Sequence, residues 1–494
     1  MVTDVEHLDV LIIGAGLSGV GAAHHLQEAH PGRSYAILEM RSALGGTWDL
    51  FRYPGIRSDS DMHTLGYSFR PWISRKAIAD GPSILEYVRD TAQEGGIVEH
   101  IRYRHRVTAA DWSSDEARWT ITAEHDGETV RFTAGFLYAC TGYYSYETPY
   151  TPDFAGADRF RGRVVHPQFW SDDIDYAGKR VVVIGSGATA MTLVPAMTDK
   201  AEHVTMLQRS PTYVASLPAE DPIAIGLRRV LPDKVAYAIT RWKNVAIQVG
   251  FYQISRRRPA LVKKVLRTML RWELGAGYDV DKHFTPSYNP WDERFCVVPD
   301  SDLFRALKKG TASVVTDRIA TFTETGIELE SGEHLDADVI VTATGLTLQM
   351  LGGADVRVDG EAVAAGERLA YRGMLLEGVP NMAFATGYAN ASFTLKVDLT
   401  SAYVCRLLAY MDAHGHAACV PVNDEAGMIS DEPLIDLKSG YIERGRHLLP
   451  KQGVRAPWRV RQNYALDRLD MARMRMDDGV LRFSPAPVRE PVPA

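Results

Sequence analysis

Two glycine-rich turns, each directly after a short apolar run, constrain the fold of this chain more than any other feature. The first turn, GAGLSG, covers residues 14–19 and follows the apolar run 8–13. The second, GSGATA, covers residues 185–190 and follows the run 181–184. An apolar run rich in β-branched residues predicts a buried parallel strand, and glycines that open a helix let the backbone approach a pyrophosphate. The sequence therefore predicts an α/β fold with two Rossmann-like dinucleotide-binding domains.

A charged residue follows the second predicted strand of each unit, and its sign differs between the units. Glu39 lies 25 residues after Gly14, whereas Arg209, followed by Ser210, lies 24 residues after Gly185. A carboxylate accepts hydrogen bonds from a free ribose hydroxyl, and a guanidinium binds a 2′-phosphate. The alternative for Arg209 is a solvated surface residue. The contrast predicts FAD in the first unit and NADPH in the second.

The stretch 45–59 reads GGTWDLFRYPGIRSD and contains too many Gly, Pro and aromatic residues for a regular helix or strand. A plain surface loop is one interpretation, but such loops rarely expose this many aromatic side chains. We favour a loop that wraps over a flat aromatic ligand.

Charge and cysteine usage exclude several classes of protein. The net charge of −7 argues against a nucleic-acid binder. The four cysteines, Cys140, Cys296, Cys405 and Cys419, form no closely spaced pair, so we expect a reducing, cytoplasmic setting and neither a disulfide scaffold nor a metal site. We also expect no signal peptide and no membrane-spanning helix, because the N-terminus lacks a basic start before an apolar run and no run of about 18 apolar residues occurs.

Residues 222–280 interrupt the second unit with a predicted helical insertion. From Arg228 to Arg271 there are twelve Lys or Arg residues and one acid, Asp233, interleaved with aromatic residues. A basic amphipathic insertion of this kind can make weak contact with a membrane surface, which would place the protein at the membrane periphery. We favour the other interpretation, in which the helices line a substrate channel and their charges are solvated.

These features divide the chain into six predicted segments. They are an FAD-binding domain (1–145), the first part of an NADPH-binding domain (146–221), the helical insertion (222–280), the second part of the NADPH-binding domain (281–370), a return to the FAD-binding domain with a C-terminal cover (371–483), and a Pro-rich, disordered tail (484–494).

The linker between the two units resembles a known family. Phe160-x-Gly162-x3-His166-x3-Trp170 matches the fingerprint of type I Baeyer–Villiger monooxygenases, except that Ser171 replaces the usual Pro or Asp after it. Residues 45–59 match the family's second motif in full, and the similarity extends over nearly the whole chain. The resemblance implies an enzyme that uses FAD, NADPH and O₂ to convert ketones to esters or lactones through a flavin C4a-peroxide, and that also oxygenates sulfur. The alternative is a flavin monooxygenase that oxidises nitrogen or sulfur without ketone activity.

The resemblance also assigns residues to roles. Arg294 matches the family's active-site arginine, whose permanent charge would stabilise anionic oxygen, and Asp59 matches the acid that positions it. The implied cofactor contacts are, for FAD, Gly14, Gly16, Ser18, Gly19, Glu39, Gly46, Thr47, Trp48, Asp59 and Val107, and for NADPH, Gly185, Ser186, Gly187, Ala188, Thr189, Arg209 and Ser210.

Other functions fit the sequence less well. A pyridine nucleotide–disulfide reductase needs a redox cysteine pair near the flavin, and the sequence has no such pair. A non-enzymatic flavin sensor leaves Arg294 and the Trp170 motif without a purpose. His166 first suggests an acid–base catalyst. We favour a different role, in which the stretch 160–170 that contains it couples movement of the NADPH unit to the flavin site.

Overall fold

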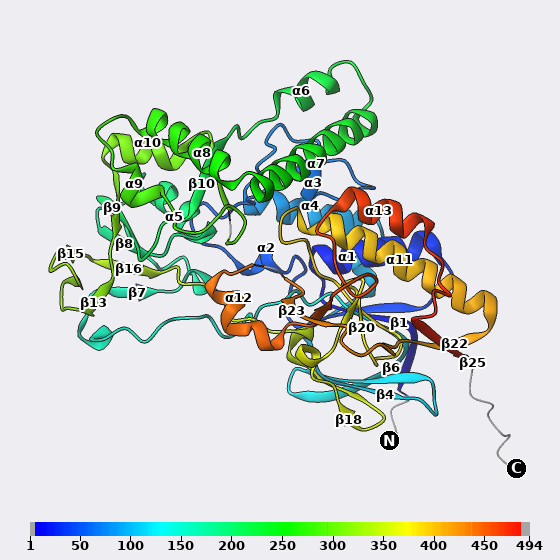
Figure 1. The fold of residues 1–494 in the computed structure, drawn as a ribbon. Helices are drawn as coiled ribbons and strands as arrows, with labels where there is room; N and C mark the ends of the chain where they lie inside the picture. The colour runs from blue at the N-terminus through cyan, green and yellow to red at the C-terminus, as the bar shows by residue number, and fades with distance from the viewer. Residues whose placement is uncertain (1–4, 294, 436, 486–494) are drawn as a thin grey trace, which may run out of the picture.

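The first glycine-rich turn follows the central strand of the larger of two main sheets. The computed structural model describes residues 5–293, 295–435 and 437–485 (Figure 1). The strand order is β18-β17-β4-β5-β6-β1-β2-β3, with β21, β20 and β19 continuing from β6. The strands are β1 (Glu6–Ile13), β2 (Tyr35–Glu39), β3 (Ile101–Tyr103), β4 (His105–Ser113), β5 (Arg118–His125), β6 (Glu128–Ala139), β17 (Asp355–Val358), β18 (Glu361–Ala362), β19 (Ala370–Tyr371), β20 (Leu375–Leu376) and β21 (Met382–Phe384).

A parallel core of this sheet carries the first βα unit. β1 pairs in parallel with β2 and β6, and its residues from Val10 to Ile12 are buried because helices cover the sheet. The helices of this part are α1 (Leu17–Ala29), α2 (Thr47–Leu50), α3 (Met62–Leu65), α4 (Gly81–Glu94) and, late in the chain, α11 (Phe393–His414). α11 packs along α1, so the C-terminal part of the chain covers the N-terminal unit.

The second sheet carries the second glycine-rich turn and is parallel throughout. Its order is β12-β9-β8-β16-β7, so β8 lies between β9 and β16. The strands are β7 (Arg163–Val165), β8 (Arg180–Ile184), β9 (His203–Gln208), β12 (Ala312–Thr316) and β16 (Val339–Thr342), with helices α5 (Ala188–Met197) and α10 (Asp302–Lys309) beside them. The predicted α/β fold with two Rossmann-like units is therefore confirmed.

The predicted insertion forms helices at the top of Figure 1. They are α6 (Pro222–Arg228), α7 (Asp233–Arg257), α8 (Pro259–Leu274) and α9 (Val280–Phe284). Smaller elements complete the fold: β10 (Tyr213–Leu217) with β11 (Phe295–Pro299), the antiparallel β13 (Ile319–Phe322), β14 (Gly326–Leu329) and β15 (His334–Asp336), β22 (His416–Pro421) with β25 (Leu481–Pro485), β23 (Ile429–Pro433) with β24 (Lys451–Gly453), and helices α12 (Gly440–Gly445) and α13 (Tyr464–Arg473).

The tail prediction is wrong at its first two residues. Ser484 and Pro485 end β25 and pair with Ala418 and His416 of β22. The Pro-rich composition suggested disorder, but Leu481 is buried and anchors the strand. Pro485 has no backbone N–H to donate, which the strand tolerates because this residue stands at its end. The rest of the predicted tail, 486–494, lies outside the described residues.

Candidate cofactor-binding and active site

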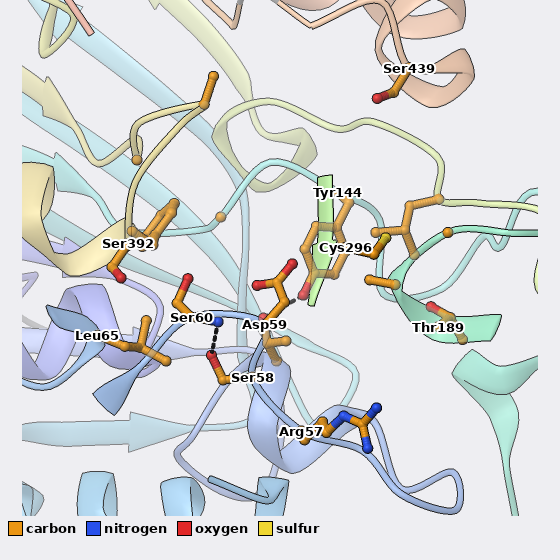
Figure 2. A pocket seen from close by; sticks show the side chains of 18 of the residues that line it. Arg57, Ser58, Asp59, Ser60, Leu65, Tyr144, Thr189, Cys296, Ser392 and Ser439 are labelled. Atoms are coloured by element: carbon orange, nitrogen blue, oxygen red, sulfur yellow. Dashed lines mark hydrogen bonds between the residues drawn. The ribbon is translucent and has the colours of Figure 1, made fainter. Parts of the chain in front are cut away.

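One cavity of about 1350 Å³ lies at the carboxyl ends of β1 and β8, where both glycine-rich turns line it. Ligands in parallel α/β sheets bind at this edge of the strands. Figure 2 shows the Asp59 carboxylate and the Tyr144 ring between Ser392 on one side of the cavity and Thr189 on the other. The structure therefore brings residues from both predicted nucleotide units into one space.

The first turn is packed so closely that its outer glycines accept no side chain. A Cβ at Gly14, where φ is +98°, would lie 2.7 Å from the carbonyl oxygen of Cys140. A Cβ at Gly19 would lie 1.9 Å from the Gly14 oxygen, and Gly19 does not line the cavity. Gly16, by contrast, lines the cavity and begins α1 without a side-chain cap. The free backbone N–H groups there form a site that attracts an anion.

Glu39 ends β2 and lies in the wall of this cavity. Its two carboxylate oxygens each accept one backbone hydrogen bond, from Ala15 N at 2.8 Å and Arg41 N at 2.9 Å. Burial raises the pKa of Glu39, and these two bonds partly oppose that effect. Each oxygen keeps further acceptor capacity, so the side chain can also accept hydrogen bonds from the hydroxyls of a ribose.

The loop 45–59 and the strand β4 bring the remaining predicted flavin contacts to the same wall. Those that line the cavity are Gly46, Thr47, Trp48, Asp59 and Val107, together with Ser18 of the first turn. Tyr144 makes a short hydrogen bond with the Thr47 hydroxyl, and burial raises its pKa well above the usual range. Tyr144 is therefore a neutral phenol near neutral pH.

The second turn has an open position that the first lacks. Gly187 begins α5 without a side-chain cap, and no atom lies within 4 Å of the place that its Cβ would take. Gly185, Ser186, Ala188, Thr189 and Arg209 also line the cavity. Room for a phosphate therefore exists at the uncapped N-terminus of this ten-residue helix.

Ser210, predicted to contact NADPH, does not line the cavity. Its carbonyl oxygen accepts a hydrogen bond from the Ser186 hydroxyl at 3.1 Å, and Ser186 also bonds Thr212 at 2.8 Å. Thr212, which does line the cavity, was missed because nothing in the local sequence distinguishes it from other threonines of a loop.

Arg294 lies outside the described residues, but its sequence neighbours lie at the cavity. Glu293 and Phe295 line it, together with Cys296 of β11. Burial raises the pKa of Glu293, and the positive charge of Arg209 partly opposes this. The residues on both sides of position 294 therefore lie at the cavity.

Two contacts join the units around the cavity. Arg57, in the loop 45–59, pairs with Asp302 at the start of α10 at 2.5 Å and donates to Met191 O of α5 at 3.3 Å.

His166, in the linker, lines the cavity, and burial lowers its pKa while the backbone groups of Gly345 and Tyr150 oppose this. His166 accepts a hydrogen bond from Gln168 N at Nδ1. This setting supports a positioning role for the linker.

The helical insertion forms the apolar part of the cavity wall. The lining residues of α7 and α8 include Ile247, Phe251, Ile254, Leu261 and Val265. These side chains agree with the channel-lining interpretation, whereas the membrane-surface contact through 228–271 stays a prediction. None of the helices formed by the described residues has the length and apolar character needed to span a bilayer.

Comparisons with known proteins agree with the two-nucleotide architecture. The flavin-binding monooxygenase-like family matches residues 77–354, and the NAD(P)-binding Rossmann-like domain matches residues 12–75. The FAD-containing monooxygenase EthA of Mycobacterium tuberculosis is 54% identical over 486 residues, which cover 98% of this chain and 99% of that protein. The probable FAD-binding monooxygenase AlmA of Acinetobacter baylyi is 49% identical, with 97% and 96% covered.

Solved structures show the same fold at lower identity. Oxidized steroid monooxygenase bound to NADP has a TM-score of 0.78 at 24% identity, covering 97% of this chain and 100% of that one. Cyclohexanone monooxygenase from Rhodococcus sp. Phi1 bound to NADP⁺ has a TM-score of 0.69 at 21% identity, covering 85% and 87%. With a family match over more than half of its length and relatives that align end to end, the chain belongs to the flavin-binding monooxygenase family of oxidoreductases.

Proposed function

We propose that this protein is an NADPH-dependent FAD monooxygenase that inserts oxygen beside a ketone carbonyl, forming esters or lactones, and that also oxygenates sulfur in thioethers or thioamides. The observation that carries the proposal is the single cavity lined by both glycine-rich turns and by Asp59. The family assignment supports the monooxygenase chemistry. The linker fingerprint from Phe160 to Trp170 supports the ketone as substrate.

Both cofactors fit the residues that line the cavity. FAD would be held by the uncapped start of α1 at Gly16, by Glu39, and by the loop residues Thr47 and Trp48. NADPH would be held by the uncapped start of α5 at Gly187 and by Arg209. When bound, NADPH supplies the hydride that reduces FAD, and the reduced FAD supplies the reaction with O₂.

The protein's own side chains then orient and protect the reacting groups. Asp59 would position Arg294, whose guanidinium keeps its charge and stabilises negative charge that develops on oxygen. Tyr144 and Thr47 form a neutral hydrogen-bonded pair in the wall. With a substrate bound, the aliphatic side chains of α7 and α8 that line the cavity would exclude water from it.

A substrate panel under ¹⁸O₂ tests the reaction. Linear, cyclic and aryl ketones and thioethers are incubated with the protein, FAD and NADPH, and the products are identified by mass. Incorporation of one labelled oxygen into an ester supports the proposal. Labelled sulfoxides without any ester would favour the alternative, a sulfur or nitrogen monooxygenase without ketone activity, and reduction of dyes without labelled product would contradict both.

The Arg209→Ala variant tests the assignment of the second nucleotide. Arg209 lines the cavity after β9 and has no carboxylate within ion-pairing distance among the described residues. Loss of a charge-assisted contact to the 2′-phosphate should weaken NADPH about tenfold and leave NADH nearly unchanged. Steady-state kinetics with both nucleotides measure this preference. An unchanged NADPH/NADH ratio would mean that the 2′-phosphate is bound elsewhere.

A further inference from the structure

Arg444 reaches the nucleotide cavity from the C-terminal part of the chain, far from both glycine-rich turns in sequence. It lies on α12, which Figure 1 shows between the two main sheets, and its side chain lines the cavity. The guanidinium carbon lies 3.3 Å from the centre of the Tyr150 ring, in a stacked cation–π contact. One of its nitrogens lies 3.2 Å from the place that a Cβ of Gly345 would take. The glycine therefore leaves the space that the guanidinium occupies.

Tyr150, on whose ring this guanidinium stacks, is held in place by other contacts. The Thr344 hydroxyl donates to the Tyr150 carbonyl oxygen at 2.8 Å. The half-buried ring of His166 faces the backbone of Tyr150 and Gly345. His166, in the linker that joins the two nucleotide units, thus helps to position Tyr150, on which Arg444 stacks. A cation held this firmly is oriented before any ligand binds.

Arg444 lacks the counter-ion that such a residue normally has. Arg444 is itself exposed, and among the residues that the structure describes no carboxylate lies within 4 Å of it, whereas Arg455, later in the same segment, pairs with Glu425. Burial lowers the pKa of Arg444, and the Tyr150 side chain only partly opposes this. A guanidinium that lines a cavity, is held over a tyrosine ring and has no carboxylate partner is free to donate hydrogen bonds to an anionic ligand.

The order of the strands indicates which anion this is. β8, which ends in the Gly185 turn, lies between β9 and β16. Arg209 follows β9 on one side, and Gly345 follows β16 on the other, so Arg444 approaches the turn from the side opposite to Arg209. The 2′-phosphate belongs to the Arg209 side, whereas the pyrophosphate belongs at the turn and the helix start between them.

We propose that Arg444 binds the pyrophosphate of the pyridine nucleotide and so connects the C-terminal segment to the second nucleotide unit. The inference rests on the proposed use of NADPH. It adds a cofactor contact from the C-terminal segment, about 100 residues beyond the end of the second sheet at Thr342. Gly345, at φ +114°, has a backbone conformation that side chains rarely permit, and its missing Cβ leaves room for the guanidinium.

Calorimetric titration of the FAD-loaded protein with NADP⁺ and with NAD⁺ measures both dissociation constants and tests this contact without turnover. Arg444→Gln should raise both dissociation constants by about tenfold, because both nucleotides carry the pyrophosphate. Arg444→Lys should recover part of this loss, since it keeps the charge but not the planar fork. The control Arg455→Gln removes a surface arginine of the same segment and should change neither constant. The FAD content and the melting temperature of each variant show that it is folded.

Two results would overturn the proposal. Unchanged affinities in Arg444→Gln would show that Arg444 makes no contact with the nucleotide. Weakening for NADP⁺ alone would assign Arg444 to the 2′-phosphate instead. If the wild-type protein bound neither nucleotide, the proposed use of NADPH would fall as well, so the failure of that proposal is distinguishable from the failure of this one.

Discussion

In the Arg294→Ala variant we expect FAD to remain bound while ester formation from a ketone falls by about 10²–10³-fold. The reason is electrostatic: a guanidinium cannot lose its proton, so it stabilises negative charge on oxygen throughout the reaction. The Asp59 carboxylate lies in the cavity wall, as do Glu293 and Phe295 on either side of position 294. Product formation measured by mass, together with the flavin absorbance of the purified variant, gives both quantities.

A nearby arginine provides the matched control for this variant. Arg256, on α7, pairs with Asp292 at 2.7 Å and does not line the cavity. Arg256→Ala should keep the wild-type rate of ester formation. Normal ester formation by Arg294→Ala would contradict the assigned role, and loss of FAD from that variant would make Arg294 a cofactor-binding residue instead.

For Asp398→Ala we expect a loss of about 3–5 kcal/mol of stability, because the substitution leaves a buried cation without its partner. Asp398, on α11, pairs with Arg241 of α7 at 3.3 Å, and both side chains are more than 90% buried. Arg241 also donates to the carbonyl oxygens of His63 at 2.9 Å and Gly66 at 2.7 Å. The pair thus attaches the helical insertion to the first nucleotide unit.

The charge state of Asp398 follows from the same contacts. Burial alone would raise its pKa, but His25, Arg241 and the backbone N–H of Ser68 together hold the pKa below its usual value. The carboxylate is therefore ionised at neutral pH. Its contribution to stability is present above the ordinary pKa of an aspartate and is lost as the pH falls through the lowered value.

Thermal unfolding, followed by the release of flavin fluorescence, measures the effect of Asp398→Ala. The control is Asp412→Ala on the same helix, which removes an exposed carboxylate paired with Arg33 and should cost about 1 kcal/mol or less. Replacing both buried partners by Arg241→Met and Asp398→Leu should recover most of the loss, since no charge is then left unpaired. Equal melting temperatures for Asp398→Ala and Asp412→Ala would contradict the role of the buried pair.

The sequence predicted the strands near both turns well, because parallel strands are encoded in short apolar runs. It was less accurate where one strand serves two partners. The apolar pattern predicts two separate strands at residues 129–132 and 136–139, whereas β6 runs unbroken from Glu128 to Ala139. Residues 128–134 pair antiparallel with β5, residues 132–139 pair in parallel with β1, and the two stretches overlap. The local hydrophobic pattern of β6 does not indicate this change of pairing partner, since the partner strands come from distant parts of the chain.

The opposite difference occurs at residues 102–107, where the sequence pattern predicts one strand and the structure has two. The predicted strand is divided at Arg104, where φ is +58°, into β3 and β4. Non-glycine residues seldom adopt this conformation, so the sequence carries no signal for the break. The pairing of β3 with β2 and of β4 with β5 requires it.

The sequence by itself determined the two glycine-rich turns and the charges of Glu39 and Arg209, because phosphate and ribose recognition depends on residues at short, regular spacing from a strand. The tertiary structure alone decided the partners of Arg241 and the position of Arg444. Both residues act through contacts with segments far away in sequence, such as that of Arg241 with Asp398, 157 residues later. A buried or unpaired charge is defined by its surroundings rather than by its neighbours in sequence.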